Sequence, residues 1–154
     1  MPLRFPTTAE TKDYKFNHTM LRVKDPKASL HFYTEILGMD LIDEHDGGDF
    51  KLFFLAYANS PSANPVRSQR EAILELTWNK GTENDSNFKY HNGNDEPQGF
   101  GHTCISVPDL EEACARFEKL GVEFKKRPQD GKMKTIAFIY DPDKYWVEII
   151  PQKK

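Results

Sequence analysis

Two histidines and two glutamates occupy equivalent places in two copies of a repeated pattern. His18 opens an alternating run in the first copy, and His102 opens one in the second. Further along, each copy places a glutamate inside an apolar run, Glu75 in Ile-Leu-Glu-Leu and Glu148 in Trp-Val-Glu-Ile. A carboxylate buried without a partner would cost several kcal/mol. Because imidazoles and carboxylates together suit Zn²⁺, Ni²⁺ or Co²⁺, we expect these four side chains to hold a divalent metal ion.

Plainer interpretations of the same residue types exist. Each glutamate could lie on a solvated sheet face, and single histidines are usually structural or solvated, as we expect for His31, His45 and His91. The repetition favours the metal site, since both glutamates stand at matching positions and each is partnered by a histidine that opens its module. Two carboxylates also balance the charge of the ion and leave room for water or substrate oxygens, as a catalytic site requires.

Further polar side chains are expected beside this metal. Alternation along a strand places Arg22 on the face of His18 and Asn79 on the face of Glu75. A cation and an amide there would suit the carboxylate of a substrate, although both could instead form surface salt bridges. A basic cluster at 126–134 surrounds a glycine; it would suit either a solvated surface or a mobile lid over an anionic ligand.

The elements that must position these residues form two modules with the order strand, helix, strand, strand, strand. In the first module, Asp25 supplies a helix cap, Pro26 a first helical residue and Gly38 the stop. The expected strands of this module are 19–24, 39–44, 50–57 and 73–78.

The second module repeats the order. Asp109 caps its helix and Gly121 ends it. The expected buried stripe of this helix is Leu110, Ala113, Cys114, Phe117 and Leu120. After the opening strand at His102, the expected strands are 122–125, 135–140 and 145–150. We therefore expect an α+β chain with two βαβββ modules at 16–80 and 101–154, an N-terminal arm at 1–15 and a linker loop at 81–100.

Composition narrows the class of protein. The chain has 154 residues and a formal net charge of −3, which gives no overall bias towards nucleic acid or an anionic membrane. No apolar run approaches the roughly 20 residues that span a bilayer, and the first residues lack the apolar core of a signal peptide. Cys104 and Cys114 form no CxxC pattern, and we expect both in the core of a cytoplasmic protein.

Several ordered motifs match a known family. The stretches that carry the match are Thr19-Met-Leu-Arg-Val-Lys-Asp-Pro, Leu74-Glu-Leu-Thr, Tyr90-His-Asn-Gly-Asn, Gly99-Phe-Gly-His, Asp130-Gly-Lys-Met-Lys and Asp141-Pro-Asp-Lys-Tyr-Trp-Val-Glu-Ile. The chain resembles glyoxalase I, the lactoylglutathione lyase family of the vicinal-oxygen-chelate superfamily. The resemblance covers 16–151 as one vicinal-oxygen-chelate domain with the glyoxalase/bleomycin-resistance type of fold.

The resemblance implies an activity and an assembly. The family joins two chains in a homodimer with its sites at the interface, where His18 and Glu75 of one subunit would meet His102 and Glu148 of the other. The implied substrate is the hemithioacetal of methylglyoxal and the cosubstrate glutathione, and the implied product is S-D-lactoylglutathione. The metal would stabilise an enediolate as a Lewis acid. Glu148 would shuttle the proton between adjacent carbons, with Glu75 its counterpart for the other substrate diastereomer.

The resemblance also assigns the residues that contact the substrate. Glutathione carboxylates would be held by Arg22, Asn79, Lys126 and Lys132, and an apolar pocket and lid would be lined by Met133, Ile136 and Phe138. Gln98 stands where animal members place an arginine for the γ-glutamyl carboxylate, so Arg67 or Arg70 could compensate. Animal members carry Gln at the position of His18 and bacterial nickel-type members carry His. The resemblance therefore implies Zn²⁺ or Ni²⁺, with Co²⁺ as a third candidate.

Two kinds of protein compete with this interpretation. A thiol transferase or an extradiol-type dioxygenase on the same scaffold would need only three protein ligands, and Glu75 would then be surplus. A metal-free module that sequesters a ligand would need none of the four residues.

Overall fold

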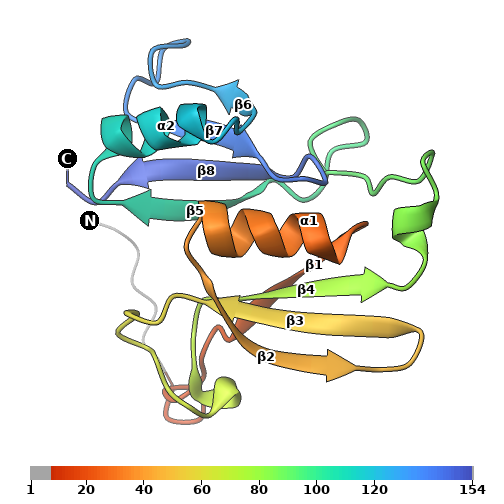
Figure 1. The fold of residues 1–154 in the computed structure, drawn as a ribbon. Coiled ribbons are helices and arrows are strands. Elements are labelled where there is room, and N and C mark those ends of the chain that lie inside the picture. Colours follow the sequence, from red (N-terminus) through yellow and green to blue (C-terminus); the bar gives the residue numbers. More distant parts are fainter. Residues whose placement is uncertain (1–7, 154) are drawn as a thin grey trace.

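The computed structural model describes residues 8–153, and Figure 1 shows their arrangement in two stacked modules. The first seven residues of the expected arm lie outside the described residues, as does Lys154. Each module contributes one four-stranded sheet, with strand orders β1-β4-β3-β2 and β5-β8-β7-β6. The predicted α+β fold with two βαβββ units is therefore confirmed.

The elements follow the predicted order in both modules. The first contains β1 (His18–Arg22), α1 (Pro26–Leu30), the π-helix η1 (His31–Ile36), β2 (Asp40–Asp46), β3 (Phe50–Ala56), the 3-10 helix η2 (Arg67–Gln69), β4 (Ile73–Asn79) and the 3-10 helix η3 (Thr82–Asn84). The second contains β5 (His102–Val107), α2 (Leu110–Lys119), β6 (Phe124–Lys126), β7 (Ala137–Tyr140) and β8 (Trp146–Pro151). In each module the first strand pairs in parallel with the last, and the remaining neighbours are antiparallel.

Both predicted helix caps are present. The Asp25 carboxylate accepts a hydrogen bond from the backbone N–H of Lys27 at 2.9 Å, and Asp109 accepts one from Glu112 at 2.9 Å. The first helix departs from a regular α-helix, because it continues from residue 31 as the π-helix η1. The Thr34 hydroxyl donates to the Leu30 carbonyl at 2.7 Å, in competition with the regular backbone bond to that oxygen.

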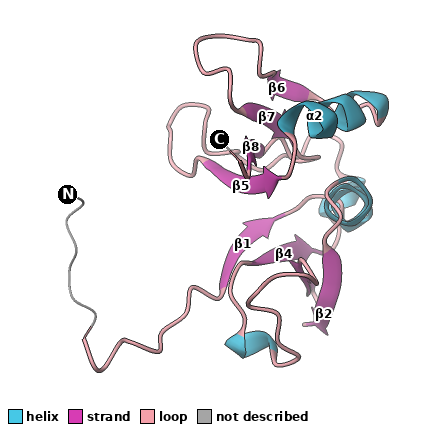
Figure 2. Cartoon of the chain, turned by 90° about the vertical axis from the view of Figure 1, so that its left-hand side faces the viewer, coloured by secondary structure: helices cyan, strands magenta, loops and turns pink. Residues whose placement is uncertain are grey.

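One contiguous apolar core spans both modules. It includes Leu21 and Leu76 from the first sheet, Phe117 from α2, and Val147 and Ile149 from β8. Figure 2 shows α2 and the first helix, seen end-on, on the same side of the two sheets, and both helices contribute residues to this core. Because side chains alternate along a strand, the residues between these core positions point to the opposite, helix-free face.

Two core predictions were wrong. Leu120 is 48% exposed, because α2 ends at Lys119 and the chain turns away from the buried stripe. Cys104 is exposed rather than buried, since it lies on the same face of β5 as His102. Within residues 8–153, no helix is long and apolar enough to cross a membrane.

Hydrogen bonds between the modules fix their relative orientation. The Tyr33 hydroxyl of η1 donates to the Asp141 carboxylate at 2.7 Å, and the Tyr145 hydroxyl donates to the Arg22 carbonyl at 3.0 Å. The backbone N–H of Lys24 donates to Asp143 at 3.0 Å. The turn between β7 and β8 is thereby docked onto the end of β1 and the first helix.

The buried Asp141 in this turn predicts a pH-dependent stability. Burial raises the pKa of its carboxyl from an ordinary 3.8 to about 7. Between pH 3.8 and about pH 7, the Asp141 carboxyl of the folded protein keeps a proton that the unfolded chain has lost. The contribution of this group to stability is therefore present at low pH and is lost as the pH rises towards 7. Relative to Asp141→Asn, the wild-type free energy of unfolding should fall with pH by up to about 1.4 kcal/mol per unit. Urea denaturation from pH 4 to 8 at one protein concentration measures the difference, and parallel curves for the two proteins would contradict it.

Candidate metal and substrate site

The first half of the candidate site lies on adjacent strands β1 and β4. The Nε2 atom of His18 is 3.0 Å from a carboxylate oxygen of Glu75. In the parallel register, Met20 is the residue opposite Glu75, so the histidine lies two residues before that pair. The Glu75 side chain is 12% exposed and the His18 side chain 38%, so the pair opens to solvent through the imidazole.

The second half repeats this geometry on β5 and β8. The Nε2 atom of His102 is 3.1 Å from a carboxylate oxygen of Glu148. Cys104 is the residue opposite Glu148, which reproduces the offset of two residues seen in the first module. The side-chain exposures, 39% for His102 and 20% for Glu148, are also close to those of the first pair. The internal repeat therefore extends to the relative placement of these four side chains.

A phenylalanine packs edge-on against each histidine. Phe54 lies opposite Glu75 in the pairing of β3 with β4, and Phe138 lies opposite Glu148 in the pairing of β7 with β8. The ring centroids are 6.3 Å apart for His18 and Phe54, and 5.2 Å apart for His102 and Phe138. Both contacts restrict the imidazole on one side. The sequence analysis identified Phe138 but missed Phe54, although each phenylalanine lies on the strand that comes just before the strand of its glutamate.

The atoms of each pair fit ligation of one divalent ion. The separations of 3.0 and 3.1 Å bring an imidazole nitrogen and a carboxylate oxygen together in each pair, and these donors suit Zn²⁺, Ni²⁺ or Co²⁺. Across the described part of the chain, however, no three His, Cys, Asp or Glu side chains gather closely enough to hold a metal ion. One chain thus offers two separate two-ligand halves.

The other predicted residues of the first module lie further along the same face. Arg22 ends β1 with an exposed side chain, and Asn79 ends β4. The Asn79 amide donates to the Tyr90 hydroxyl at 3.3 Å. Both side chains are located at the ends of the two strands that carry His18 and Glu75.

The predicted residues of the second module surround the loop between β6 and β7. Lys132 and Met133 are exposed in this loop, and Ile136 is half-buried at its end. The ammonium of Lys126 donates to the carbonyls of Arg127, Met133 and Ile136 at 3.1, 2.6 and 3.0 Å. Lys126 therefore holds both ends of the loop together in this structure, a role that the sequence did not indicate.

The residues considered for the γ-glutamyl carboxylate lie in different surroundings. Gln98 is exposed in the linker, where its amide donates to the Asn94 carbonyl at 3.4 Å. Arg70 is only 7% exposed, and its guanidinium donates to the Tyr57 carbonyl at 3.2 Å. It therefore stabilises the loop after β3. The Arg67 guanidinium stacks over the Phe54 ring at 3.7 Å and bonds Asp43 at 2.8 Å. Arg67 is thus the arginine of the two that lies beside the first His–Glu pair.

Cys104 contributes a thiol rather than a thiolate to the second half. Partial burial of its sulfur raises the pKa of the thiol to about 11, and the neighbouring Glu148 carboxylate adds to the rise. Without a metal ion nearby, this side chain is therefore protonated and neutral at physiological pH, and it is the thiolate that binds metals and attacks electrophiles. It takes the place that Met20 has in the first half.

Comparisons with known proteins agree with the geometry. Residues 15–149 match the family described as the Glyoxalase/Bleomycin resistance protein/Dioxygenase superfamily. The chain is 52% identical to a lactoylglutathione lyase of Pseudomonas putida, over 94% of this chain and 87% of the relative. It is 54% identical to a lactoylglutathione lyase of Schizosaccharomyces pombe, again over 94% of this chain.

The lengths of these relatives differ. The chain spans 87% of the Pseudomonas relative but only 47%, about half, of the fission yeast relative. Among solved structures, the trypanothione-dependent glyoxalase I of Leishmania major is similar, with a TM-score of 0.69 and 32% identity. That match covers 91% of this chain and 88% of the Leishmania chain.

Proposed function

This chain belongs to the glyoxalase/bleomycin resistance protein/dioxygenase superfamily, and we propose that it converts the hemithioacetal of methylglyoxal and glutathione into S-D-lactoylglutathione. Relatives that are named lactoylglutathione lyase or glyoxalase I and are 51–55% identical support this activity. The observation that carries the proposal is the matched pair of His–Glu contacts, one in each module, at 3.0 and 3.1 Å.

The proposed metal site is shared between two copies of the chain in a homodimer. His18 and Glu75 of one copy would be joined by the His102 and Glu148 positions of the other, giving two imidazoles and two carboxylates. This assembly is supported by the two-ligand halves of the single chain, because a divalent ion requires more protein ligands than either half offers. The two copies would form two such sites. The donor set favours Zn²⁺ or Ni²⁺, with Co²⁺ as a third candidate.

The reaction moves one proton between adjacent carbons of the hemithioacetal. A divalent ion held by the four ligands would supply Lewis acidity to the substrate oxygens. Glu148 would take the proton as general base from the carbon that bears the hydroxyl and the sulfur, and return it to the neighbouring carbonyl carbon through an enediolate. The hydroxyl proton would pass from the first oxygen to the second, so that substrate and product are isomers. Glu75 would do the same for the other diastereomer. Only 12% of the Glu75 side chain and 20% of the Glu148 side chain are exposed. This low exposure supports the proposed role, because it limits exchange of the transferred proton with water.

The remaining predicted residues would bind and orient the glutathione moiety. Arg22 and Asn79 lie along one half of the site, and Lys126 and Lys132 along the other, so the tripeptide would lie across the interface. To bind a glutathione carboxylate, Lys126 would have to exchange one of its three bonds to the loop carbonyls. Charge-assisted hydrogen bonds to its carboxylates favour these residue types. Gln98 would add a neutral contact. Met133, Ile136 and Phe138 would cover the apolar part of the substrate.

We propose the cytosol as the compartment of this reaction. Both cysteines, Cys104 and Cys114, are free thiols, as is usual in a reducing environment. The net charge of −3 gives no general attraction to nucleic acid or to an anionic membrane, so the partners proposed are the small-molecule substrate and a second copy of the chain.

The competing activities leave part of the site unused. A dioxygenase or thiol transferase with three protein ligands would have no use for one of the four residues, and a sequestering protein would use none. The relatives at 51–55% identity also favour the lyase over these alternatives.

An assay after metal removal tests the proposal. The purified protein is treated with a chelator and then assayed with methylglyoxal and glutathione, with Zn²⁺, Ni²⁺ and Co²⁺ added back separately. We expect chelation to lower the rate by roughly 100-fold or more, because a Lewis acid stabilises the transition state by several kcal/mol. At least one metal should restore the rate, with S-D-lactoylglutathione as the product. Full activity in the metal-free protein, or a different product, would contradict the proposal.

A further inference from the structure

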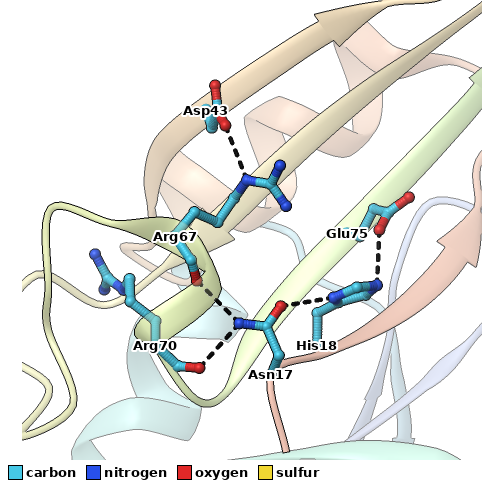
Figure 3. Close-up of polar contacts among 6 residues, drawn as sticks. All are labelled: Asn17, His18, Asp43, Arg67, Arg70 and Glu75. Atoms are coloured by element: carbon cyan, nitrogen blue, oxygen red, sulfur yellow. Dashed lines mark hydrogen bonds and ion pairs between the residues drawn. The ribbon is translucent and has the colours of Figure 1, made fainter.

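Asn17 is held in one orientation by the loop that follows β3. Its amide nitrogen donates to two backbone carbonyls, those of Arg67 and Arg70, both at 2.9 Å (Figure 3). Carbonyl oxygens only accept hydrogen bonds. The nitrogen of the Asn17 amide must therefore face the loop, and the oxygen must point the other way. The usual ambiguity between the two ends of an asparagine amide is resolved by these two contacts.

The Asn17 oxygen faces the histidine that follows it in the chain. It lies 2.8 Å from the Nδ1 atom of His18 (Figure 3). Because an amide oxygen cannot donate, the hydrogen between these atoms must belong to Nδ1. A neutral imidazole that carries its proton on Nδ1 has its lone pair on Nε2. Nε2 lies 3.0 Å from Glu75. A carboxylate only accepts, so this close contact requires a proton or a metal ion between the two atoms. With Nδ1 occupied by its own proton, Nε2 is the ring atom that can bind a metal.

We propose that Asn17 is a positioning residue that holds His18 in the Nδ1–H tautomer and so presents Nε2 to a divalent metal ion. This inference rests on the proposed function, which makes His18 a ligand. Metal-bound histidines usually donate their second ring N–H to a nearby acceptor, which fixes the ring and raises its basicity. Asn17 is such an acceptor, and the loop at residues 67–70 holds it in place.

The two halves of the site differ in this respect. Gly101 precedes His102 where Asn17 precedes His18, so no side chain is present there to accept a bond from the ring. Within residues 8–153, the His102 ring makes its polar contact with Glu148, through Nε2. His18 is therefore the histidine whose second ring nitrogen is held by a neighbouring side chain. Because the second half has no counterpart of Asn17, the metal affinity should depend on this one residue.

A purely structural role for Asn17 is the competing explanation, because its amide also ties β1 to the 67–70 turn. Two substitutions separate the roles. Asn17→Ala removes both the acceptor for His18 and the donors to the turn. Asn17→Asp keeps an oxygen that accepts from Nδ1–H but loses the donors, since a carboxylate cannot bond to two carbonyls. Asn64→Ala is the matched control: Asn64 bonds Gln69 at 3.2 Å and Val66 at 2.8 Å within the same loop and has no bond to His18.

The experiment measures the affinity of the metal-depleted proteins for Zn²⁺, Ni²⁺ and Co²⁺ by competition with a chelator. We expect Asn17→Ala to weaken binding by about 10- to 100-fold, whereas Asn17→Asp and Asn64→Ala remain within a few-fold of wild type. Melting temperatures of the metal-free proteins report the loss of the turn contacts, which both Asn17 variants share. Unchanged affinity in Asn17→Ala, or equal losses in both Asn17 variants, would overturn this inference alone. A wild-type protein that binds none of the three metals would overturn the proposed metal centre and this inference together.

Discussion

Replacing Glu148 with glutamine is expected to leave the fold intact and to lower kcat by roughly 10²- to 10⁴-fold, the usual range for loss of a general base. Glutamine has the same shape, and its amide oxygen or nitrogen can occupy the position that lies 3.1 Å from His102. An amide cannot accept the transferred proton at neutral pH, and it is a weaker metal ligand than a carboxylate. The rate with methylglyoxal and glutathione measures the loss, and the melting temperature checks the fold.

A surface glutamate of the same module provides the matched control for this variant. Glu123 is exposed and forms an ion pair with Lys144. Exposed pairs contribute little to stability, so Glu123→Gln should retain wild-type turnover and nearly wild-type stability. Near-wild-type activity in Glu148→Gln would rule out Glu148 as the base, whatever metal the protein holds.

The overall fold could be predicted because its signals are local and occur twice. Asp25 and Asp109 each precede a helix, and each accepts the hydrogen bond that a cap requires. Strand faces followed from the period of two, which placed His18 opposite to Leu21 and left Leu21 in the core. The π-helix η1 was not predictable in this way, because neither its caps nor its apolar spacing distinguishes a π-helix from a regular α-helix.

In the candidate site, only the residues that occur in both copies of the repeat could be predicted from the sequence pattern. The repeat predicted which histidine belongs with which glutamate, and the structure places each pair in contact. The contacts of Asn17 with the 67–70 loop and of Phe54 with His18 escaped prediction. They join segments at least 50 and 36 residues apart in the chain, through a loop and a strand register that sequence periodicity does not specify. Cys104 was misplaced in the core because cysteine is usually buried, although the period of two places it on the same strand face as the exposed His102.

Mixed dimers provide the second large effect, and they test whether the site is shared between two chains. One chain carries His18→Ala with Glu75→Gln, which disables the first half, and the other carries His102→Ala with Glu148→Gln, which disables the second. Each variant alone should be inactive, because every site in its homodimer lacks two ligands. In a mixed dimer, one site combines both damaged halves and the other combines both intact halves.

The central measurement is therefore the activity of mixed dimers, co-expressed with two different affinity tags and purified through both. If each site takes one half from each subunit, the mixed dimer should have about half of the wild-type turnover with methylglyoxal and glutathione, and should bind one metal ion where the wild-type dimer binds two. Mixed dimers as inactive as their parents would show that a site is not completed by the partner subunit, and would contradict the account.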